Sequence, residues 1–421
     1  MNQEIYDVVV VGGGPAGSIA AEDLARRGLH VMLLDRAGRI KPCGGAVPPQ
    51  MLRDFDVPRD VLEAEVTSAR MVSPSNNAVD MPIEIGYVGM VDRGHFDEWL
   101  RERARLAGAV RQNGTFVGLG VSDGVSRELS FQPGKKGATA EPVTIKARYI
   151  IGADGAKSKV ARAAIRGAEK LQSVFAYHEI VEAPDTDKPI NRSEAFNSAL
   201  EADPKRCDVV YNGKLSPDFY SWIFPHGKTI SVGTGTAVQG FGIREAVTRL
   251  REQSGLDTAV TVRTEGAPIP MKPLKIWDDA KHVVLAGDAA GVVAPASGEG
   301  IFYAMTCGRM VAETVAEAIA TENPACLKQA RKRFLKKHGK VFWVLGIMQR
   351  FWYHSDKRRE RFVTMCADAD VQRLTWESYL NKKLVGRDPM AHVRVFFKDV
   401  GHLLGLGSET GNKTDSKASR P

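Results

Sequence analysis

The sequence contains few residues of the kind that build disulfide or zinc frameworks. Its five cysteines are an odd number in 421 residues, lie far apart between Cys43 and Cys366, and never occur as Cys-x-x-Cys. Such a set argues against a disulfide scaffold and against a zinc ribbon. The nine histidines include no pair four residues apart, the spacing by which one helix face binds zinc. We therefore expect no metal site.

Long apolar runs are also scarce. In the C-terminal half the longest, residues 341–348, is far shorter than the ~20 residues of a membrane-spanning helix, so we expect no such helix. The N-terminus has neither the basic start nor the cleavage site of a signal peptide, which predicts a cytoplasmic protein. Apolar residues make up 43% and charged residues 26%, as in ordinary globular proteins, and the length suggests two or three packed units.

A glycine-rich turn follows the first apolar run of the chain. Residues 5–11 read as a buried parallel strand, and Gly12, Gly14 and Gly17 then fit G-x-G-x-x-G before a predicted helix. The next strand, predicted over 30–35, ends at Asp35. Glycines let the backbone approach a pyrophosphate at a helix N-terminus, and the aspartate can accept hydrogen bonds from a ribose. This unit predicts a dinucleotide site.

Two later segments carry related signatures. Asp154-Gly155 follows the apolar run 149–151, and Asp288 follows the apolar run 283–286, with Gly298 and Gly300 shortly after. Together with Arg93, which opens a predicted helix, these motifs resemble those of the flavoprotein hydroxylases, the para-hydroxybenzoate hydroxylase-like superfamily.

The resemblance implies that the bound dinucleotide is FAD. It places Asp288 at the ribityl chain, Arg93 beside the phosphates and Val117 at the adenine. The residues that we expect to contact FAD are Gly12, Gly14, Ala16, Gly17, Asp35, Cys43, Gly44, Gly45, Arg93, Val117, Asp154, Gly155, Asp288, Pro295, Gly298, Gly300 and Ile301. No second G-x-G-x-x-G is present in the sequence, and the superfamily implies NADPH as a transient electron donor, with a protein donor as the alternative.

Two segments set the chain apart from ordinary hydroxylases. Residues 41–48 read Lys-Pro-Cys-Gly-Gly-Ala-Val-Pro, and residues 220–225 read Tyr-Ser-Trp-Ile-Phe-Pro. Both resemble the geranylgeranyl reductase family, over about residues 5 to 400, and the first matches its chlorophyll and bacteriochlorophyll branch. The family implies hydrogenation of three isolated double bonds of a geranylgeranyl chain, on a prenylated tetrapyrrole or a prenyl diphosphate. A flavin monooxygenase of an apolar substrate, an archaeal-type lipid reductase and a flavin-loaded carrier are the alternatives.

Three residues are candidates for catalysis, as positioning groups or relays. Tyr220 and Trp222 alternate with Phe224 on a predicted strand, so they share one face and either line a prenyl tunnel or fill the sheet core. A tyrosine with its ordinary pKa near ~10 is a poor acid, so Tyr220 is expected to position rather than protonate. Cys43 could relay a proton, act as a redox-sensitive thiol or fill space. No residue stands out as the general acid.

Positive charge gathers in one window of the chain. Residues 328–361 contain twelve Lys or Arg against two acidic residues, a net charge of +10, so the rest of the chain carries −2 of the total +8. Aromatic residues accompany this charge, which suits a peripheral position on an anionic membrane surface. The family resemblance implies that this surface is the photosynthetic inner membrane. The alternative is a packed helix with a solvated basic face. No nucleic-acid recognition motif accompanies the charge, so we expect no nucleic-acid partner.

The order of the segments predicts an α/β fold with a Rossmann-type FAD-binding domain, an inserted and mostly antiparallel sheet domain for the substrate, and a C-terminal helical region. The FAD-binding domain is predicted over 1–70, 91–165 and 275–320, and the substrate domain over 71–90 and 166–274. The helical region is predicted over 321–406, followed by a disordered tail over 407–421. The sequence does not predict the oligomeric state.

Overall fold

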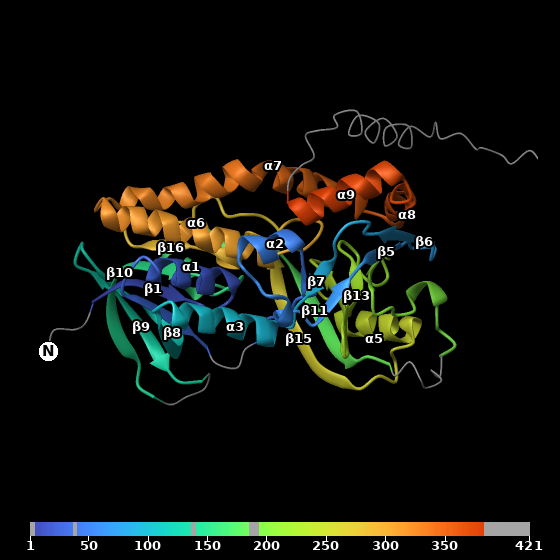
Figure 1. The fold of residues 1–421 in the computed structure, drawn as a ribbon, viewed down its shortest axis with the longest axis horizontal. Coiled ribbons are helices and arrows are strands. Elements are labelled where there is room, and N and C mark those ends of the chain that lie inside the picture. Colours follow the sequence, from blue (N-terminus) through green and yellow to red (C-terminus); the bar gives the residue numbers. More distant parts are fainter. Residues whose placement is uncertain (1–4, 37–39, 136–139, 185–192, 383–421) are drawn as a thin grey trace, which may run out of the picture.

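Two sheet-containing units lie side by side, and a layer of helices runs along one edge of both (Figure 1). The computed structural model describes residues 5–36, 40–135, 140–184 and 193–382. The predicted tail over 407–421 and the last part of the predicted helical region lie outside the described residues.

The first unit is built on a parallel sheet. Continuous apolar runs, buried on both faces, form its central strands, as expected where helices cover a parallel sheet. β1 pairs in parallel with β2 and β10, β2 with β8, and β10 with β16, while β9 is antiparallel to both β8 and β10. The strands are β1 (Ile5–Val11), β2 (Val31–Asp35), β8 (Val110–Ser122), β9 (Arg127–Pro133), β10 (Val143–Gly152) and β16 (Val283–Leu285).

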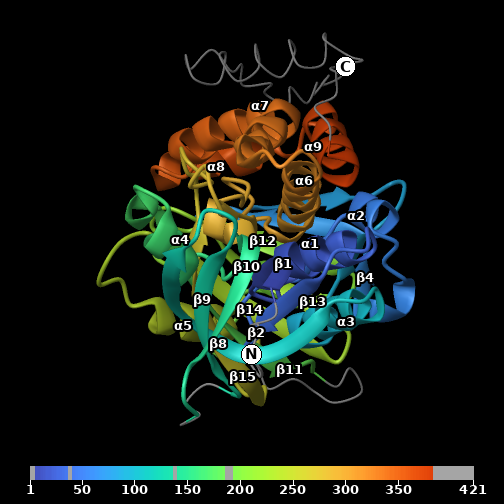
Figure 2. The same ribbon diagram turned by 90° about the vertical axis from the view of Figure 1, so that its left-hand side faces the viewer.

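Helices pack against this sheet, most of them on one side (Figure 2). Among them, α1 starts at Pro15 directly after the glycine turn, and it packs against α3 and the long α6. The helices of this unit are α1 (Pro15–Ala25), α2 (Pro49–Asp54), α3 (Arg93–Leu106), α4 (Lys159–Ala164) and α6 (Ile301–Ala320). The predicted βαβ unit is therefore present.

The second unit is a seven-stranded sheet with the order β15-β11-β14-β13-β12-β5-β6. All neighbours are antiparallel except β5 and β12, which run in parallel. Its strands are β5 (Ser68–Val72), β6 (Ala78–Pro82), β11 (Ser173–Glu182), β12 (Arg206–Val210), β13 (Ser221–His226), β14 (Thr229–Thr236) and β15 (Thr261–Pro270). Helix α5 (Ile243–Ser254) packs on β11 and β14. This sheet and the parallel sheet confirm the predicted fold class.

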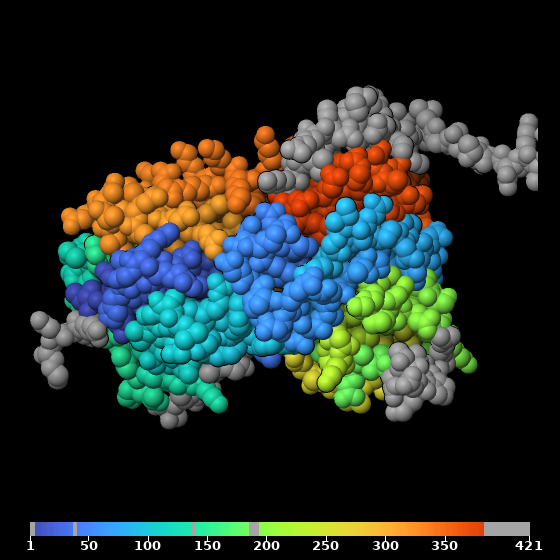
Figure 3. Space-filling view, in the orientation of Figure 1, coloured from blue at the N-terminus to red at the C-terminus, as the bar shows by residue number. Residues whose placement is uncertain are grey.

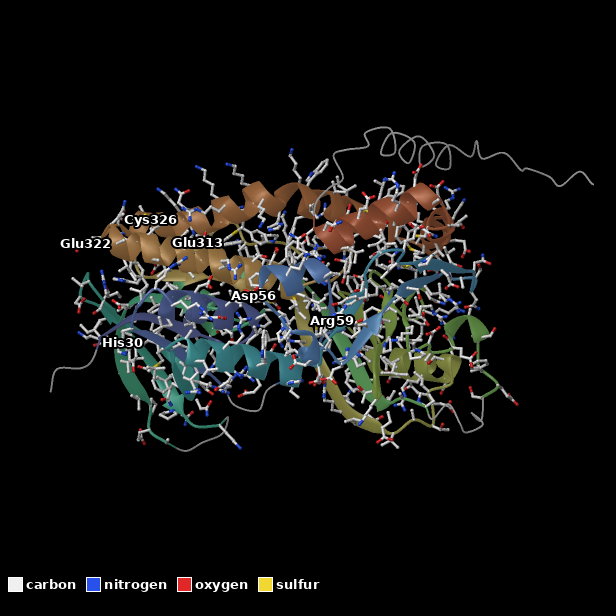
Figure 4. All side chains as sticks on the ribbon, viewed as in Figure 1. His30, Asp56, Arg59, Glu313, Glu322 and Cys326 are labelled. Carbon is white, nitrogen blue, oxygen red and sulfur yellow. The ribbon has the colours of Figure 1, made fainter. Side chains whose placement is uncertain are left out.

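A small sheet lies between the two units, near the labelled Arg59 in Figure 4. It consists of β3 (Ala46–Val47), β4 (Ala64–Val66) and β7 (Val88–Met90). The predicted boundary at residue 70 falls inside β5, because Ser68 already pairs with Arg206 of β12. Within the range 71–90, β6 belongs to the seven-stranded sheet, whereas β7 belongs to the small one.

The helical layer continues from α6. Near Glu322, at the left end of Figure 4, the chain turns back into α7 (Gln329–Trp352), which runs beside α6. Two shorter helices, α8 (Asp356–Met365) and α9 (Ala369–Asn381), then lie over the seven-stranded sheet. None of the helices in the described part of the chain is both long enough and apolar enough to span a bilayer.

Candidate active site

One cavity of about 960 Å³ joins the two units. Its volume is at the upper end of the ~300–1,000 Å³ typical of ligand sites. The predicted site residues that line it are Gly12, Gly14, Ala16, Asp35, Cys43, Gly44, Arg93, Asp154, Gly155, Tyr220, Trp222, Asp288, Gly298, Gly300 and Ile301. Gly17, Gly45, Val117 and Pro295 are not among its lining residues. The cavity therefore connects the glycine turn of the parallel sheet with the aromatic face of the seven-stranded sheet.

The glycine turn leaves space at the start of α1. A side chain at Gly14 would meet no atom within 4 Å, although a Cβ at Gly12 would lie 2.3 Å from the Ala153 carbonyl oxygen. Gly14 is the N-cap of α1, and Pro15 occupies its first turn. Because Gly14 cannot cap the helix with a side chain, the first amide groups and the positive end of the helix dipole remain available to an anion. This part of the wall fits the pyrophosphate of a dinucleotide.

Gly17 has a different role in the same turn. A Cβ at this position would lie 1.8 Å from the Gly12 carbonyl oxygen. The residue is thus required for the close packing of α1 on the turn, and it does not line the cavity.

Asp35 ends β2 and meets an arginine that the sequence analysis missed. Nη1 of Arg101 lies 3.4 Å from Oδ2 of Asp35 and donates to the Gly13 carbonyl at 3.2 Å. Burial raises the pKa of Asp35, and the hydrogen bond from Gly13 and the charge of Arg101 oppose that rise. Arg101 also lines the cavity, so an aspartate and an arginine lie together in its wall beside the glycine turn.

The missed arginine lies on a stripe of α3 that starts at Arg93. Residues 93, 97 and 101 are four apart and therefore share one face of the helix, a signal that the sequence contains. Arg93 is buried and forms a two-pronged ion pair with Asp97, at 2.8 and 2.7 Å. Burial alone would lower the pKa of Arg93, but Asp97 outweighs it and the pKa is raised. The cation is therefore held permanently at the cavity wall.

The two other aspartates of the signatures have unlike surroundings. Asp288 is ion-paired with Lys41, which ties the loop 41–48 to the segment before α6. Asp154 instead accepts hydrogen bonds from the Ser158 hydroxyl and from the Lys159 amide, the latter at 2.7 Å, and so holds the start of α4. Both carboxylates line the cavity, but Asp154 is already engaged by its own turn.

An aromatic wall closes the far end of the cavity. Tyr220, directly before β13, and Trp222 and Phe224 on β13 all line it, with ring centroids 6.2 and 6.4 Å apart along the series. The Tyr220 hydroxyl donates to the Ser297 carbonyl at 2.6 Å. Burial raises the pKa of Tyr220 further above its usual value, so its proton stays on the ring and ties the aromatic wall to the loop before α6.

The glycines after Cys43 make close contacts with this wall. A Cβ at Gly44 would lie 2.9 Å from the Phe224 ring, and one at Gly45 would lie 2.4 Å from Nε2 of His226. Gly45 also has a φ of +74°, which glycine adopts without strain. These two glycines therefore allow the backbone at residues 44 and 45 to lie close to β13. Cys43 is half-buried, and its sulfur accepts the Gly45 amide at 3.4 Å.

Three more polar residues of the cavity wall, two of them charged, escaped the sequence analysis. His178 on β11 and Arg263 and Glu265 on β15 line the cavity beside the aromatic wall. Their strands alternate too weakly in polarity to mark these positions, and no local motif joins them. Only the pairing of distant strands brings them together.

The comparisons with known proteins agree with this geometry. The sequence matches the FAD binding domain family over residues 5–337. It is 53% identical over 401 residues to the geranylgeranyl diphosphate reductase of Rhodobacter capsulatus, covering 95% of this chain and 98% of that protein. The chloroplastic geranylgeranyl diphosphate reductase of Oryza sativa subsp. japonica is 37% identical, with 94% and 86% covered. Archaeal relatives named digeranylgeranylglycerophospholipid reductase are less similar, at 28% to 31% identity.

A solved structure has the same fold. The crystal structure of a geranylgeranyl bacteriochlorophyll reductase-like protein from Thermoplasma acidophilum superposes with a TM-score of 0.76 at 22% identity, covering 92% of this chain and 99% of that one. The fold, the match to the FAD binding domain and a relative that is 53% identical over nearly the full length all indicate the same family. The chain therefore belongs to the geranylgeranyl reductase family of FAD-binding flavoproteins.

Proposed function

We propose that this protein is an FAD-dependent reductase that hydrogenates three isolated double bonds of a geranylgeranyl chain to give a phytyl chain, in (bacterio)chlorophyll biosynthesis. The observation that carries the proposal is that one cavity has two kinds of wall: the glycine turn, Asp35 and Arg101 at one end, and the aromatic wall at the other. The names of the relatives support a prenyl substrate. NADPH is the proposed electron donor.

The division of the cavity suits this chemistry. An isolated alkene has no electron-withdrawing group, so its reduction depends on holding the carbon chain close to the hydride donor in one orientation. FAD, when bound and reduced, would supply the hydride to one carbon of the double bond, and the other carbon must take up a proton. Trp222 and Phe224 offer the chain an apolar surface, while Gly14 and the start of α1 hold the pyrophosphate of the cofactor. Asp35 accepts hydrogen bonds from the ribose hydroxyls.

A mass-spectrometric assay tests the reaction. The purified protein, FAD and NADPH are incubated without oxygen, with geranylgeranyl diphosphate in one arm and with membranes that contain geranylgeranylated bacteriochlorophyll in the other. A rise in mass by two hydrogens per step, ending after three steps, is the expected result, and the arm in which it occurs identifies the substrate. In a parallel incubation with air, NADPH-dependent oxygen consumption with an oxygenated product, and no hydrogenated product in either anaerobic arm, would instead establish the monooxygenase alternative.

Two variants assign the ends of the cavity. Asp288→Ala removes the carboxylate that is ion-paired with Lys41, and the variant is expected to purify without flavin absorbance. Full flavin absorbance in this variant would contradict a role of Asp288 in FAD binding. Trp222→Ala is expected to retain FAD and lose alkene reduction, because the apolar wall is opened. Undiminished reduction in Trp222→Ala would assign the aromatic residues to the sheet core alone.

Helix α7 offers a surface for an anionic membrane, and we propose that the protein binds there peripherally. The exposed residues Lys332, Lys336, Lys340, Trp343 and Ile347 lie three or four apart and so form one stripe, with Trp343 69% and Ile347 48% exposed. In the space-filling view α7, in orange, forms the upper edge of the left half of the molecule (Figure 3). Lysines beside an exposed tryptophan suit anionic lipid headgroups.

Vesicle sedimentation tests this surface. The protein should sediment with vesicles of phosphatidylglycerol and release in high salt, and the variant K332E/K336E/K340E should stay in the supernatant. A control variant, K205E/K228E/K281E, makes the same change of charge at three exposed lysines that lie outside α7 and outside the cavity lining, and it is expected to bind as the wild type does. Equal binding of K332E/K336E/K340E and wild type would refute the α7 surface.

A further inference from the structure

Behind the aromatic wall, four side chains form one hydrogen-bonded chain. Nε1 of Trp222 donates to the Ser231 hydroxyl at 3.0 Å, and that hydroxyl lies 2.8 Å from Nδ1 of His178. Nε2 of His178 lies 2.8 Å from a carboxylate oxygen of Glu265. His178 is 1% exposed and Ser231 is fully buried, so water cannot replace these contacts. Trp222, His178 and Glu265 line the cavity, which puts the chain directly against the proposed prenyl site.

The chain follows one row of the seven-stranded sheet. Glu265 of β15 is paired with His178 of β11, His178 with Gly233 of β14, and Gly233 with Trp222 of β13. Ser231 lies two residues before Gly233 and therefore faces the same side of the sheet. Four strands thus each contribute one side chain to the hydrogen-bonded series that ends at the Trp222 indole.

With His178 in its neutral form, the hydrogen bonds have one consistent direction. The indole Nε1–H of Trp222 can only donate, so Ser231 accepts from it and has its own proton to give to Nδ1 of His178. Burial works to raise the pKa of Glu265, but His178 and Arg263 outweigh it and the pKa is lowered, so this carboxylate only accepts. His178 consequently has its proton on Nε2. Each donor along the chain has one acceptor, which leaves the indole a single orientation.

Gly233 on β14 favours the same orientation of the Trp222 indole. A Cβ at this position would lie 2.3 Å from Cζ2 of Trp222 and 2.6 Å from Cβ of His178. The indole therefore occupies the space that a side chain at Gly233 would take. A side chain at Gly233 would push the ring into the cavity.

We propose that Ser231 and His178 are positioning residues, which hold the Trp222 indole in one orientation and thereby set how the prenyl chain lies in the cavity. This inference rests on the proposed reductase function and deepens it. An indole ring that can turn would let the prenyl chain slide in the cavity. Each of the three reductions needs a different double bond of the prenyl chain at the same place beside the flavin. Loss of the support should therefore change which products accumulate.

Ser231→Ala tests the proposal through the products. In this variant kcat/KM is expected to fall about tenfold to a hundredfold, since small misplacements of a reacting group cost that much. Partly reduced dihydro and tetrahydro chains are expected to accumulate, and Ser231→Thr, which keeps a hydroxyl, should restore the wild-type product ratio. Flavin absorbance and the unfolding temperature of each variant check that the fold is intact.

Ser221→Ala is the matched control. Ser221 is equally buried in the same pair of strands and donates to the Thr234 hydroxyl at 2.8 Å, but as the neighbour of Trp222 it faces the other side of the sheet. The control should keep the product ratio of the wild type. A Ser231→Ala product ratio equal to that of Ser221→Ala would overturn the proposal.

A spectroscopic measurement separates this inference from the proposed function. The six tryptophans give six indole N–H signals in a protein labelled with ¹⁵N-tryptophan, and Trp222→Phe identifies the one of interest. In Ser231→Ala that signal should shift and exchange faster with water; an unmoved, protected signal would refute the positioning role. The measurement needs no turnover, so an inactive wild type would refute the reductase function alone.

Discussion

The packing of α6 on the glycine turn leads to a sharp prediction for Gly308→Ala. Gly308 lies in the middle of α6, and a Cβ there would be 2.1 Å from the Ala16 carbonyl oxygen. Ordinary contacts begin at 3.4 Å, so α6 and the start of α1 would have to separate by about 1.3 Å. The obstacle is backbone rather than a flexible side chain, so the strain cannot be relieved by a change of rotamer.

The size of the effect follows from two opposed terms. Overpacking costs about 1–3 kcal/mol, and a backbone contact belongs at the upper end of that range. Replacing glycine by alanine inside a helix contributes about 1 kcal/mol in the other direction. The net loss in the free energy of unfolding should be about 2 kcal/mol. Because Ala16 lines the cavity beside Gly14, the affinity for FAD should fall as well. Each 1.4 kcal/mol of lost binding free energy weakens the affinity about tenfold.

Urea unfolding and titration with FAD measure both quantities. Gly346→Ala on α7 is the control, because a Cβ at Gly346 would meet no described atom within 4 Å and only the gain of about 1 kcal/mol remains. Gly308→Ala should be less stable than the wild type and Gly346→Ala slightly more stable. If Gly308→Ala unfolds at the same urea concentration as Gly346→Ala and binds FAD as the wild type does, the argument from close packing is refuted.

Two further predictions concern His226, which lies against Gly45, and Arg101 of the cavity wall. Burial lowers the pKa of His226 to about 4, so below pH 6.5 the unfolded chain takes up a proton that the folded chain does not. The free energy of unfolding should therefore fall by about 3 kcal/mol between pH 6.5 and pH 4. In His226→Gln, unfolding curves recorded over this pH range should show a smaller fall. An equally steep fall in His226→Gln would contradict the assignment. Arg101→Ala removes the contacts to Asp35 and to the Gly13 carbonyl and should weaken FAD binding about tenfold in a fluorescence titration. Arg105→Ala, which removes only an exposed pair with Glu102, should bind FAD normally.

Local patterns of the sequence determined the first unit. The apolar run of β1, the turn at Gly12 and Gly14, and the acidic end of β2 at Asp35 are consecutive features of one βαβ unit, and the structure places them as their spacing predicts. The alternation of Tyr220, Trp222 and Phe224 likewise predicted one shared face. Such features depend on residues a few positions apart, for which backbone geometry alone decides where side chains point.

Tertiary structure decided the positions that depend on register between strands. Val117, which the resemblance places at the adenine, is 49% exposed, whereas its neighbour Phe116 lines the cavity, because adjacent residues of β8 face opposite sides of the sheet. The contact of Val117 with the adenine stays a prediction. His178 and Glu265 are 87 residues apart, and only the pairing of β11 with β15 makes them partners. Which distant strands pair, and in which register, follows from the packing of the whole sheet, and no local pattern records it.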